Sequence, residues 1–348
     1  MPWFRRNKDG SSNNDEVRLS QSLQKTFRQY NAETENQMQR DRDALERGRI
    51  PEAAEERINR TVKRELPWMS TLDIPDLYLA DEIRMTPLVQ VTGSCYYRAA
   101  SDMNGRVYLD SNYDAANLVY AYYRAKNEAV DRMLQEAALA EAHAVVDATF
   151  RFSREANVVE CSVIGTAVQF AGLRPPKTAL VSPLSGEEFY KLLMRGWVPV
   201  NYCLGYHWHC MPVGFGTRSV NSMWNFQNQE LTGVTSRFSE TRRYAMQQMV
   251  SDARGGPKVD GFVGVRIETK IEETELRIFA GYGGGFSGFS MMGNGITIDG
   301  TFYPFGSEGV AEVPAYNLEF FATGAGVAHI GKGRITPKEV QSYLSLLN

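Results

Sequence analysis

Residues 70–97 of this 348-residue chain read STLDIPDLYLADEIRMTPLVQVTGSCYY, and residues 182–209 read SPLSGEEFYKLLMRGWVPVNYCLGYHWH. The second stretch follows the first at a constant offset of 112 positions, without a gap. At this offset Leu77-Tyr78 aligns with Phe189-Tyr190, and Gly93 aligns with Gly205. Self-similarity over such a length determines the architecture before any local motif does. The sequence therefore predicts two copies of one module.

The similarity continues downstream with different spacers. The matched helix positions are Ala129, Met133 and Ala137 in the first copy, and Ala245, Met249 and Ala253 in the second. In each copy we expect an amphipathic segment (76–84; 186–195), a strand (88–98; 198–210), a long helix (115–142; 236–253) and two further strands (144–152 and 158–170; 261–271 and 318–330). The predicted fold class is α+β, with two tandem β-α-β-β modules whose helix lies across an antiparallel sheet.

Three further details concern the long helices and the second copy. Ala129 and Ala245 occupy matching positions, where small side chains would let helix and sheet approach closely. Asp114 is a candidate N-cap for the first helix, and Thr235 or Ser236 for the second. The second copy also carries a long insertion, 272–316, rich in Gly, Phe and Met. Such a loop is typical of an adaptable interaction surface.

Four segments are expected along the chain. Residues 1–69 form an N-terminal arm in which about two-fifths of positions are charged, a composition near that of disordered segments. Helical patterns at 16–47 and 51–65 leave two alternatives open, a helical, docked arm or a mobile one. The first module covers 70–173 and the second 174–335. Thr336 as a cap and Pro337 at the first helical position predict a short C-terminal helix over 336–348.

Composition excludes several classes of protein. A formal net charge of -3 gives no global attraction to nucleic acid or to anionic lipid. The longest apolar stretches are of strand length and interrupted, so we expect no membrane-spanning helix. Four scattered cysteines in so long a chain indicate free thiols in a reducing compartment rather than a disulfide framework. We therefore expect a cytoplasmic protein.

The sharpest local motif is Cys203-Leu-Gly-Tyr-His207-Trp-His209-Cys210, whose imidazoles and thiols suit zinc or copper. Strand alternation places Cys203, His207 and His209 on one face and Cys210 on the other. The Cα atoms of the two histidines would lie roughly 6.5 Å apart, whereas Cys203 would lie about 13 Å from His207. This strand thus supplies two ligands at most. The alternative is a strand whose aromatic and imidazole groups pack at an interface.

Enzymatic chemistry does not assemble from the sequence. There is no Gly-x-Ser-x-Gly nucleophile elbow. The glycine run at Gly281–Gly285 lacks the Lys-Ser/Thr of a phosphate loop. We therefore predict no catalytic residues and no obligatory cofactor, with zinc or copper as the only candidate ligands.

Several separated segments resemble the YbjQ-like family of "putative heavy-metal-binding" domains. They are Val91-Thr-Gly-Ser94, the Ala-rich helix, Ala142-His-Ala-Val-Val-Asp-Ala148, Val163-Ile-Gly-Thr-Ala-Val168 and, in the second copy, Glu319-Phe-Phe-Ala-Thr-Gly-Ala-Gly-Val327. The resemblance covers roughly 70–330 in tandem. It implies a dodecin-like β-α-β-β fold, assembly into a five-membered ring and no established activity. Asp147 departs from the family pattern, which usually has Gly there, whereas the second copy keeps Gly264.

The functional prediction is a non-enzymatic, homo-oligomeric structural protein built on ring-type, five-fold contacts that extend toward a closed shell. A three-stranded module leaves sheet edges unpaired, and pairing them around a ring removes that liability. The expected partners are further copies of the chain, with a second protein partner as a role for the arm or for 272–316. The alternative is a metal-binding or metal-sensing protein that uses His207 and His209.

Overall fold

The computed structural model describes residues 34–99, 111–174, 176–212, 232–255, 258–279, 289–292, 294–298, 301–307 and 309–329. The chain falls into two compact units, 1–57 and 58–348. In the first unit a helix covers 34–46, and Arg40 pairs with Glu52 at 3.5 Å. Helix α2 (Glu52–Val62) runs across the division between the units. Most of the expected arm helix at 16–47 and the C-terminal helix at 336–348 lie outside the described residues.

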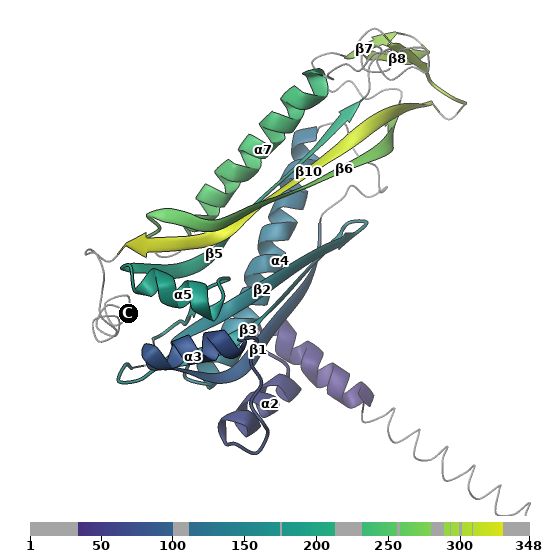
Figure 1. The fold of residues 1–348 in the computed structure, drawn as a ribbon. Coiled ribbons are helices and arrows are strands. Elements are labelled where there is room, and N and C mark those ends of the chain that lie inside the picture. The colour runs from purple at the N-terminus through teal and green to yellow at the C-terminus, as the bar shows by residue number, and fades with distance from the viewer. Residues whose placement is uncertain are drawn as a thin grey trace, which may run out of the picture. The chain divides into compact units, whose positions relative to one another are not determined.

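The first sheet of the second unit is four-stranded (Figure 1). Its order is β1 (Met85–Arg98), β3 (Val158–Phe170), β2 (Ala144–Glu155) and β4 (Leu180–Val181). Its first three strands are antiparallel, and β4 joins β2 in parallel. Helix α3 (Ile74–Glu82) precedes β1, and helix α4 (Ser111–Leu139) connects β1 to β2.

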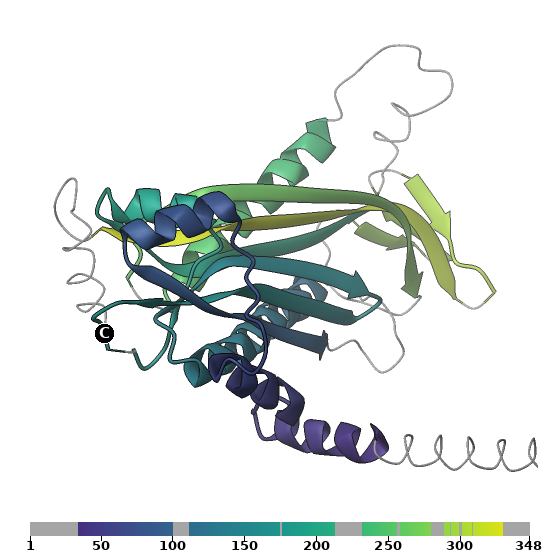
Figure 2. The same ribbon diagram turned by 60° about the horizontal axis from the view of Figure 1, so that its bottom comes forward.

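The second sheet has the order β5 (Trp197–Pro212), β10 (Val310–His329) and β6 (Gly261–Phe279), all antiparallel. Helix α5 (Gly186–Leu193) precedes β5, and α7 (Thr232–Ala253) follows it. In the first sheet β3 lies between β1 and β2, and in the second sheet β10 lies between β5 and β6. Helices α3 and α5 lie side by side across the two sheets (Figure 2). The predicted α+β class is confirmed.

The insertion of the second copy is partly ordered as strand. A small antiparallel sheet is formed by strands β7 (Phe289–Met292), β8 (Gly295–Ile298) and β9 (Thr301–Pro304). β6 continues to Phe279 and β10 begins at Val310, so both strands reach well into the segment expected as insertion from 272. Continuous pairing between the two strands explains this length, since each added residue pair satisfies more backbone groups. The helices likewise begin before their predicted caps, at Ser111 and Thr232.

Helices α3 and α5, which lead into β1 and β5, both begin with a capping box. Asp73 accepts a hydrogen bond from the amide of Asp76, whose carboxylate accepts in return from the amide of Asp73. Ser185 and Glu188 form the same capping box 112 positions later. Each box satisfies two amide donors that a helix start would leave free.

Each long helix crosses its first strand at a glycine. A Cβ atom at Gly93 would lie 1.9 Å from the carbonyl oxygen of Ala129, and one at Gly205 would lie 1.9 Å from that of Ala245. Ala129 and Ala245 are themselves buried. The predicted close approach of helix and sheet is therefore confirmed, and it brings backbone against backbone.

A bulge occurs at the same place in β2 and in β6. Asp147 has a φ of 54° and Gly264 has a φ of 60°, both in the left-handed region. The strand register shifts at these points, between Val146 and Thr149 in the first sheet and opposite Thr323 and Ala325 in the second. Asp tolerates this conformation better than most residues, which explains how the first copy keeps the bulge without Gly.

Replacing Gly205 by Ala tests the crossing. The added methyl group must displace the α7 backbone, so we expect the free energy of unfolding to fall by about 1–3 kcal/mol or more. Gly233→Ala is the control, because a Cβ there meets nothing within 4 Å. Thermal or urea denaturation that gave the same stability for both variants would show that the crossing is not close.

Candidate functional site at the junction of the two sheets

The two sheets meet through an aromatic core. Tyr122 on α4 lies 3.9 Å from Tyr206 on β5 and 5.2 Å from Phe321 on β10, measured between ring centroids. Phe150 on β2 stacks on Tyr202 at 3.7 Å with an interplanar angle of 6°. Tyr122 and Tyr206 are fully buried. Aromatic burial of this kind makes the junction a continuous core rather than a contact between separate domains.

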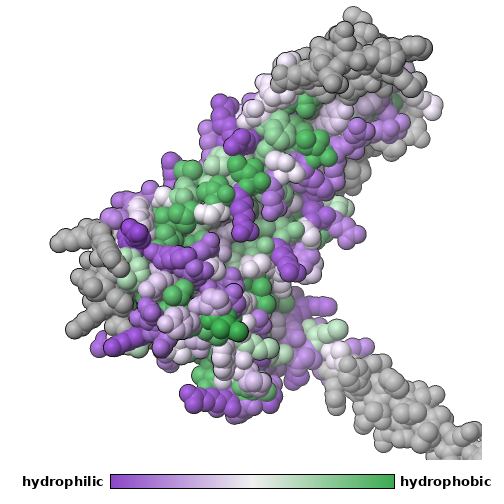
Figure 3. All heavy atoms as spheres, viewed as in Figure 1, coloured by the Kyte–Doolittle hydropathy of each residue, from purple (hydrophilic) through white to green (hydrophobic). Residues whose placement is uncertain are grey.

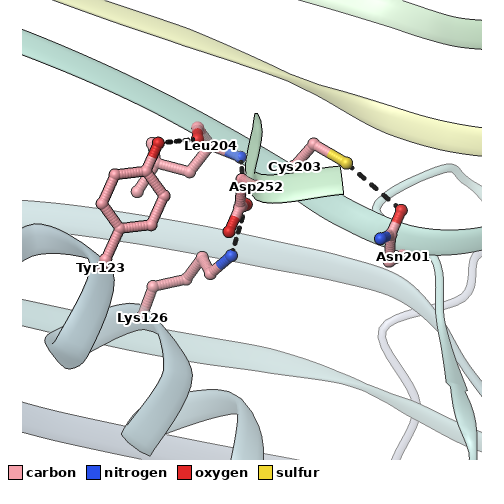
Figure 4. Close-up of polar contacts among 6 residues, drawn as sticks. All are labelled: Tyr123, Lys126, Asn201, Cys203, Leu204 and Asp252. Atoms are coloured by element: carbon pink, nitrogen blue, oxygen red, sulfur yellow. Dashed lines mark hydrogen bonds and ion pairs between the residues drawn. The ribbon is translucent and has the colours of Figure 1, made fainter. Parts of the chain in front are cut away.

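A polar cluster holds α4 on the edge of the second sheet (Figure 4). The Lys126 ammonium lies 2.5 Å from the Asp252 carboxylate, and the two side chains are only 7% and 11% exposed. Asp252 also accepts the Leu204 amide at 2.9 Å, and the Tyr123 hydroxyl donates to the Leu204 carbonyl at 2.6 Å. Both outward backbone groups of Leu204 are therefore satisfied by helix side chains. Because β5 is an edge strand, this removes a point at which another strand could pair.

The first sheet repeats part of this arrangement. The Thr92 amide donates to the Glu136 carboxylate at 2.8 Å. Thr92 and Glu136 precede Leu204 and Asp252 by the same offsets that relate the two strands and the two helices. A carboxylate on each long helix therefore covers the amide of its edge strand.

A second ion pair in the junction joins Arg154 to Glu319. The Glu319 carboxylate is 4% exposed, and Arg154 is 22% exposed. Burial raises the pKa of Glu319 above its ordinary value, whereas the Arg154 guanidinium favours the charged form and lowers it. This pair links β2 of the first sheet to β10 of the second.

The lead-in of the second module completes the junction. Its strand β4 adds to the free edge of β2, with Ala144 beside Leu180 and Val145 beside Val181. Asp76 on α3 accepts the amide of Glu187 at 2.6 Å and so lies at the start of α5. The second module thus contacts the first through a strand, a helix and a sheet face.

A cavity of about 250 Å³ lies between β2, β6 and β10. Its walls combine apolar side chains such as Phe150, Phe321 and Leu184 with the charged Arg266 and Glu268. Neither a cysteine nor a histidine lines it, whereas hydroxyl-bearing residues such as Thr149 and Tyr202 do. Part of the space follows from Gly264 and Gly324, which present no side chain there.

The predicted metal ligands lie on β5, where His207 and Cys203 contact α7 and Cys203 is also next to the polar cluster (Figure 4). His207 contacts the ring of Tyr244 on α7 at 5.0 Å, and Cys203 packs with Ala245 and Met249 beneath the same helix. Cys203 donates its thiol hydrogen to the side-chain oxygen of Asn201 at 3.2 Å. Within the described ranges, no three His, Cys, Asp or Glu side chains come close enough to hold an ion.

Burial disfavours the thiolate form of the cysteine but favours the neutral, metal-binding form of the imidazoles. It raises the pKa of the Cys203 thiol to about 11, so that thiol is protonated at neutral pH. It lowers the pKa of His207 and His209, and the neighbouring imidazole and Arg237 respectively act in the same direction. All four cysteines are free and buried.

The junction residues were not predicted from the sequence. Lys126 and Tyr123 stand on the predicted helix, where a cation and a tyrosine are ordinary surface residues. One signal was present, because Asp252 and Glu136 are acidic at matched helix positions. Matched carboxylates on helices that cover edge strands point to amide capping, but not to the lysine that joins the two modules.

Comparison with known proteins finds a family model that matches part of the chain. Residues 115–171 match the family model described as "Putative heavy-metal-binding", YbjQ_1. This match confirms the resemblance noted above for the first module, from α4 through β3. The chain is also 27% identical over 212 residues to the encapsulin nanocompartment protein Rv1762c of Mycobacterium tuberculosis, covering 58% of this chain and 76% of that protein. No solved structure matches the chain.

In the part of the chain that the structure describes, every helix is too short or too polar to cross a lipid bilayer.

Replacing Lys126 by Met tests the polar cluster. The change leaves the buried Asp252 carboxylate without its cation, so we expect a loss of about 3–5 kcal/mol in the free energy of unfolding. Lys191→Met is the matched control, since the Lys191–Glu187 pair is largely exposed and should contribute less than about 1 kcal/mol. Urea denaturation at one fixed protein concentration measures both, and equal losses would contradict a buried role for Lys126.

Proposed function

We propose that this protein is a self-assembling structural protein that forms shell-like or ring-based homo-oligomers and catalyses no reaction. The likeness to a nanocompartment protein over 76% of that protein's length carries the proposal. The YbjQ-like match at 115–171 supports it, since the resemblance implies ring assembly. The long edge strand β6 supports it as well, because an open edge in a stable protein calls for a covering partner.

The proposal includes the finer description of the fold as two tandem dodecin-like modules. Its support is the common strand order, β1-β3-β2 and β5-β10-β6, together with the glycine crossings at Gly93 and Gly205 and the bulges at Asp147 and Gly264. Five-fold symmetry is carried by the family resemblance, and it stays a prediction. Copies of this chain are the expected partners.

Native mass spectrometry and electron microscopy of the purified chain test this function. We expect masses that are multiples of 39.1 kDa and discrete closed particles. A 39.1 kDa monomer at micromolar concentration would contradict self-assembly.

Metal binding is the second candidate function. The family description and the placement of His207 and His209 on one strand favour it. Three protein ligands are the usual minimum for a tight zinc site, and Cys203 is a protonated thiol bonded to Asn201. The assembly role therefore agrees better with the geometry.

Dialysis followed by elemental analysis decides between the two functions. We expect far less than one equivalent of zinc or copper, and we expect the double variant His207→Ala, His209→Ala to assemble like the native chain. Stoichiometric metal that survives dialysis and disappears in this variant would favour metal binding.

A further inference from the structure

We propose that copies of this chain join head to tail by repeating the junction between their own two modules. The contact uses residues 68–78 of one copy and strand β6 of the next. This inference rests on the proposed self-assembly and specifies the surface through which it occurs. Both halves of the contact are present in a single chain, and each is the counterpart of a surface already used inside it.

The internal junction shows how a lead-in segment docks. Residues 180–184 run along the edge of β2, where Ser182 donates to the Val145 carbonyl at 2.8 Å. The amides of Ala148 and Asp147, at the bulge, donate to the carbonyls of Ser182 and Leu184 at 2.9 Å each. Every backbone group in this exchange belongs to a strand edge that would otherwise be free.

Residues 68–72 are the counterpart of 180–184 at the offset of 112. Trp68 and Met69 stand at the positions of Leu180 and Val181, yet they are 52% and 54% exposed, whereas Val181 is 6% exposed. The segment already has the local geometry of its docked counterpart. The Leu72 amide donates to the Ser70 hydroxyl at 3.0 Å, as the Leu184 amide donates to the Ser182 hydroxyl at 3.3 Å.

Helix α3 continues the same pattern. Ile74 and Tyr78 are 83% and 72% exposed, and they lie one turn apart on the helix. Their counterparts on α5 are covered by the first module, because Gly186 packs on Asp76 and the Tyr190 hydroxyl donates to Glu82. Tyr78 is thus exposed where its counterpart makes a contact. Ile74 stands in place of a glycine at which a Cβ would lie 2.7 Å from Asp76, so α3 must dock farther from its neighbour than α5 does.

The receiving surface is β6. Among the described residues, β6 pairs with β10 along one edge and with no strand along the other. Val265, Ile267 and Ile271 are 41%, 37% and 51% exposed on one face of this strand. In β2 the matching strip, with Ala148 and Phe150, is packed into the junction.

The position of α7 explains why this strip is open. α7 lies on β5 and β10, as α4 lies on β1 and β3, so α7 leaves β6 uncovered and α4 leaves β2 uncovered. In the first module the second sheet covers β2. A band of apolar side chains is visible along α7 and the second sheet in the space-filling view (Figure 3).

The matched bulges fix the expected register. Val145 pairs with Val181 two residues before Asp147, so Phe262, two residues before Gly264, should lie beside Met69 of the next copy. Gly261 should lie beside Trp68, and the amide of Val265 should donate to the carbonyl of Ser70. A second copy fits this surface because it alone carries both the strand and the α3 face that the internal junction combines.

Two half-site variants test the contact in the full chain. The first is Trp68→Asp with Met69→Asp, and the second is Ile267→Asp with Ile271→Asp. Each is expected to lower the share of chains in assemblies at least about tenfold, as measured by native mass spectrometry, because it buries charge in an apolar contact. Tyr120→Asp, at a comparably exposed residue on α4 outside the contact, is the control and should assemble like the native chain. Circular dichroism confirms that each variant is folded.

Mixing the two variants gives the discriminating result. The first variant keeps an intact β6 and the second keeps an intact lead-in, so together they should form a one-to-one heterodimer and nothing larger. A native chain that assembles while both variants also assemble like it would overturn this contact and leave the proposed function standing. A native chain that is monomeric would overturn the proposed function itself.

Discussion

The close crossing of a helix over a strand at a glycine is the constraint on which the rest of this structure depends. At Gly93 and again at Gly205, the helix backbone occupies the space that a side chain would need. This contact holds α4 over β1 and β3 and away from β2. In the same way it holds α7 over β5 and β10 and away from β6. The uncovered strand, β2 or β6, is then available to another module. The second sheet covers β2 through contacts among Phe150, Tyr202 and Phe321.

The same helix position determines how the sheet edges are protected. With α4 close to β1 and α7 close to β5, a carboxylate from each helix reaches an outward amide of the edge strand. In the second sheet this carboxylate also needs a cation, and Lys126 supplies it from the other module. Edge protection and module packing therefore share Asp252, which couples the stability of the two modules.

The sequence predicts the repeated features because they are local and periodic. Gly93 and Gly205, the alanines opposite them and the β-α-β-β order of elements along the chain all follow from the internal repeat. The junction does not follow from it, because Lys126, Tyr123 and Arg154 differ from their counterparts and their partners are far away in the chain. The length of β6 beyond Ile271 also escaped prediction, since a run of Glu and Thr reads as loop until its pairing with β10 is known. His207 and His209 look like ligands in sequence, and the structure shows that no third His, Cys, Asp or Glu side chain of the described residues comes close enough to complete a site.

A junction that joins unlike surfaces has consequences for symmetry. In the proposed contact, strand β6 of one chain binds residues 68–78 of the next, and these two surfaces differ. Repeated contacts between unlike surfaces give either a closed ring or an open filament. Each chain contributes two modules that are already joined, so every ring built by this contact contains an even number of modules. A ring of five single modules cannot be made from whole chains in this way, whereas five chains would give ten. Closure into a shell would then require a second contact outside the junction. In the described part of the chain, the small sheet β7-β8-β9 is a structured element outside the module pattern, although Ile296, Ile298 and Tyr303 pack into the same core as the junction.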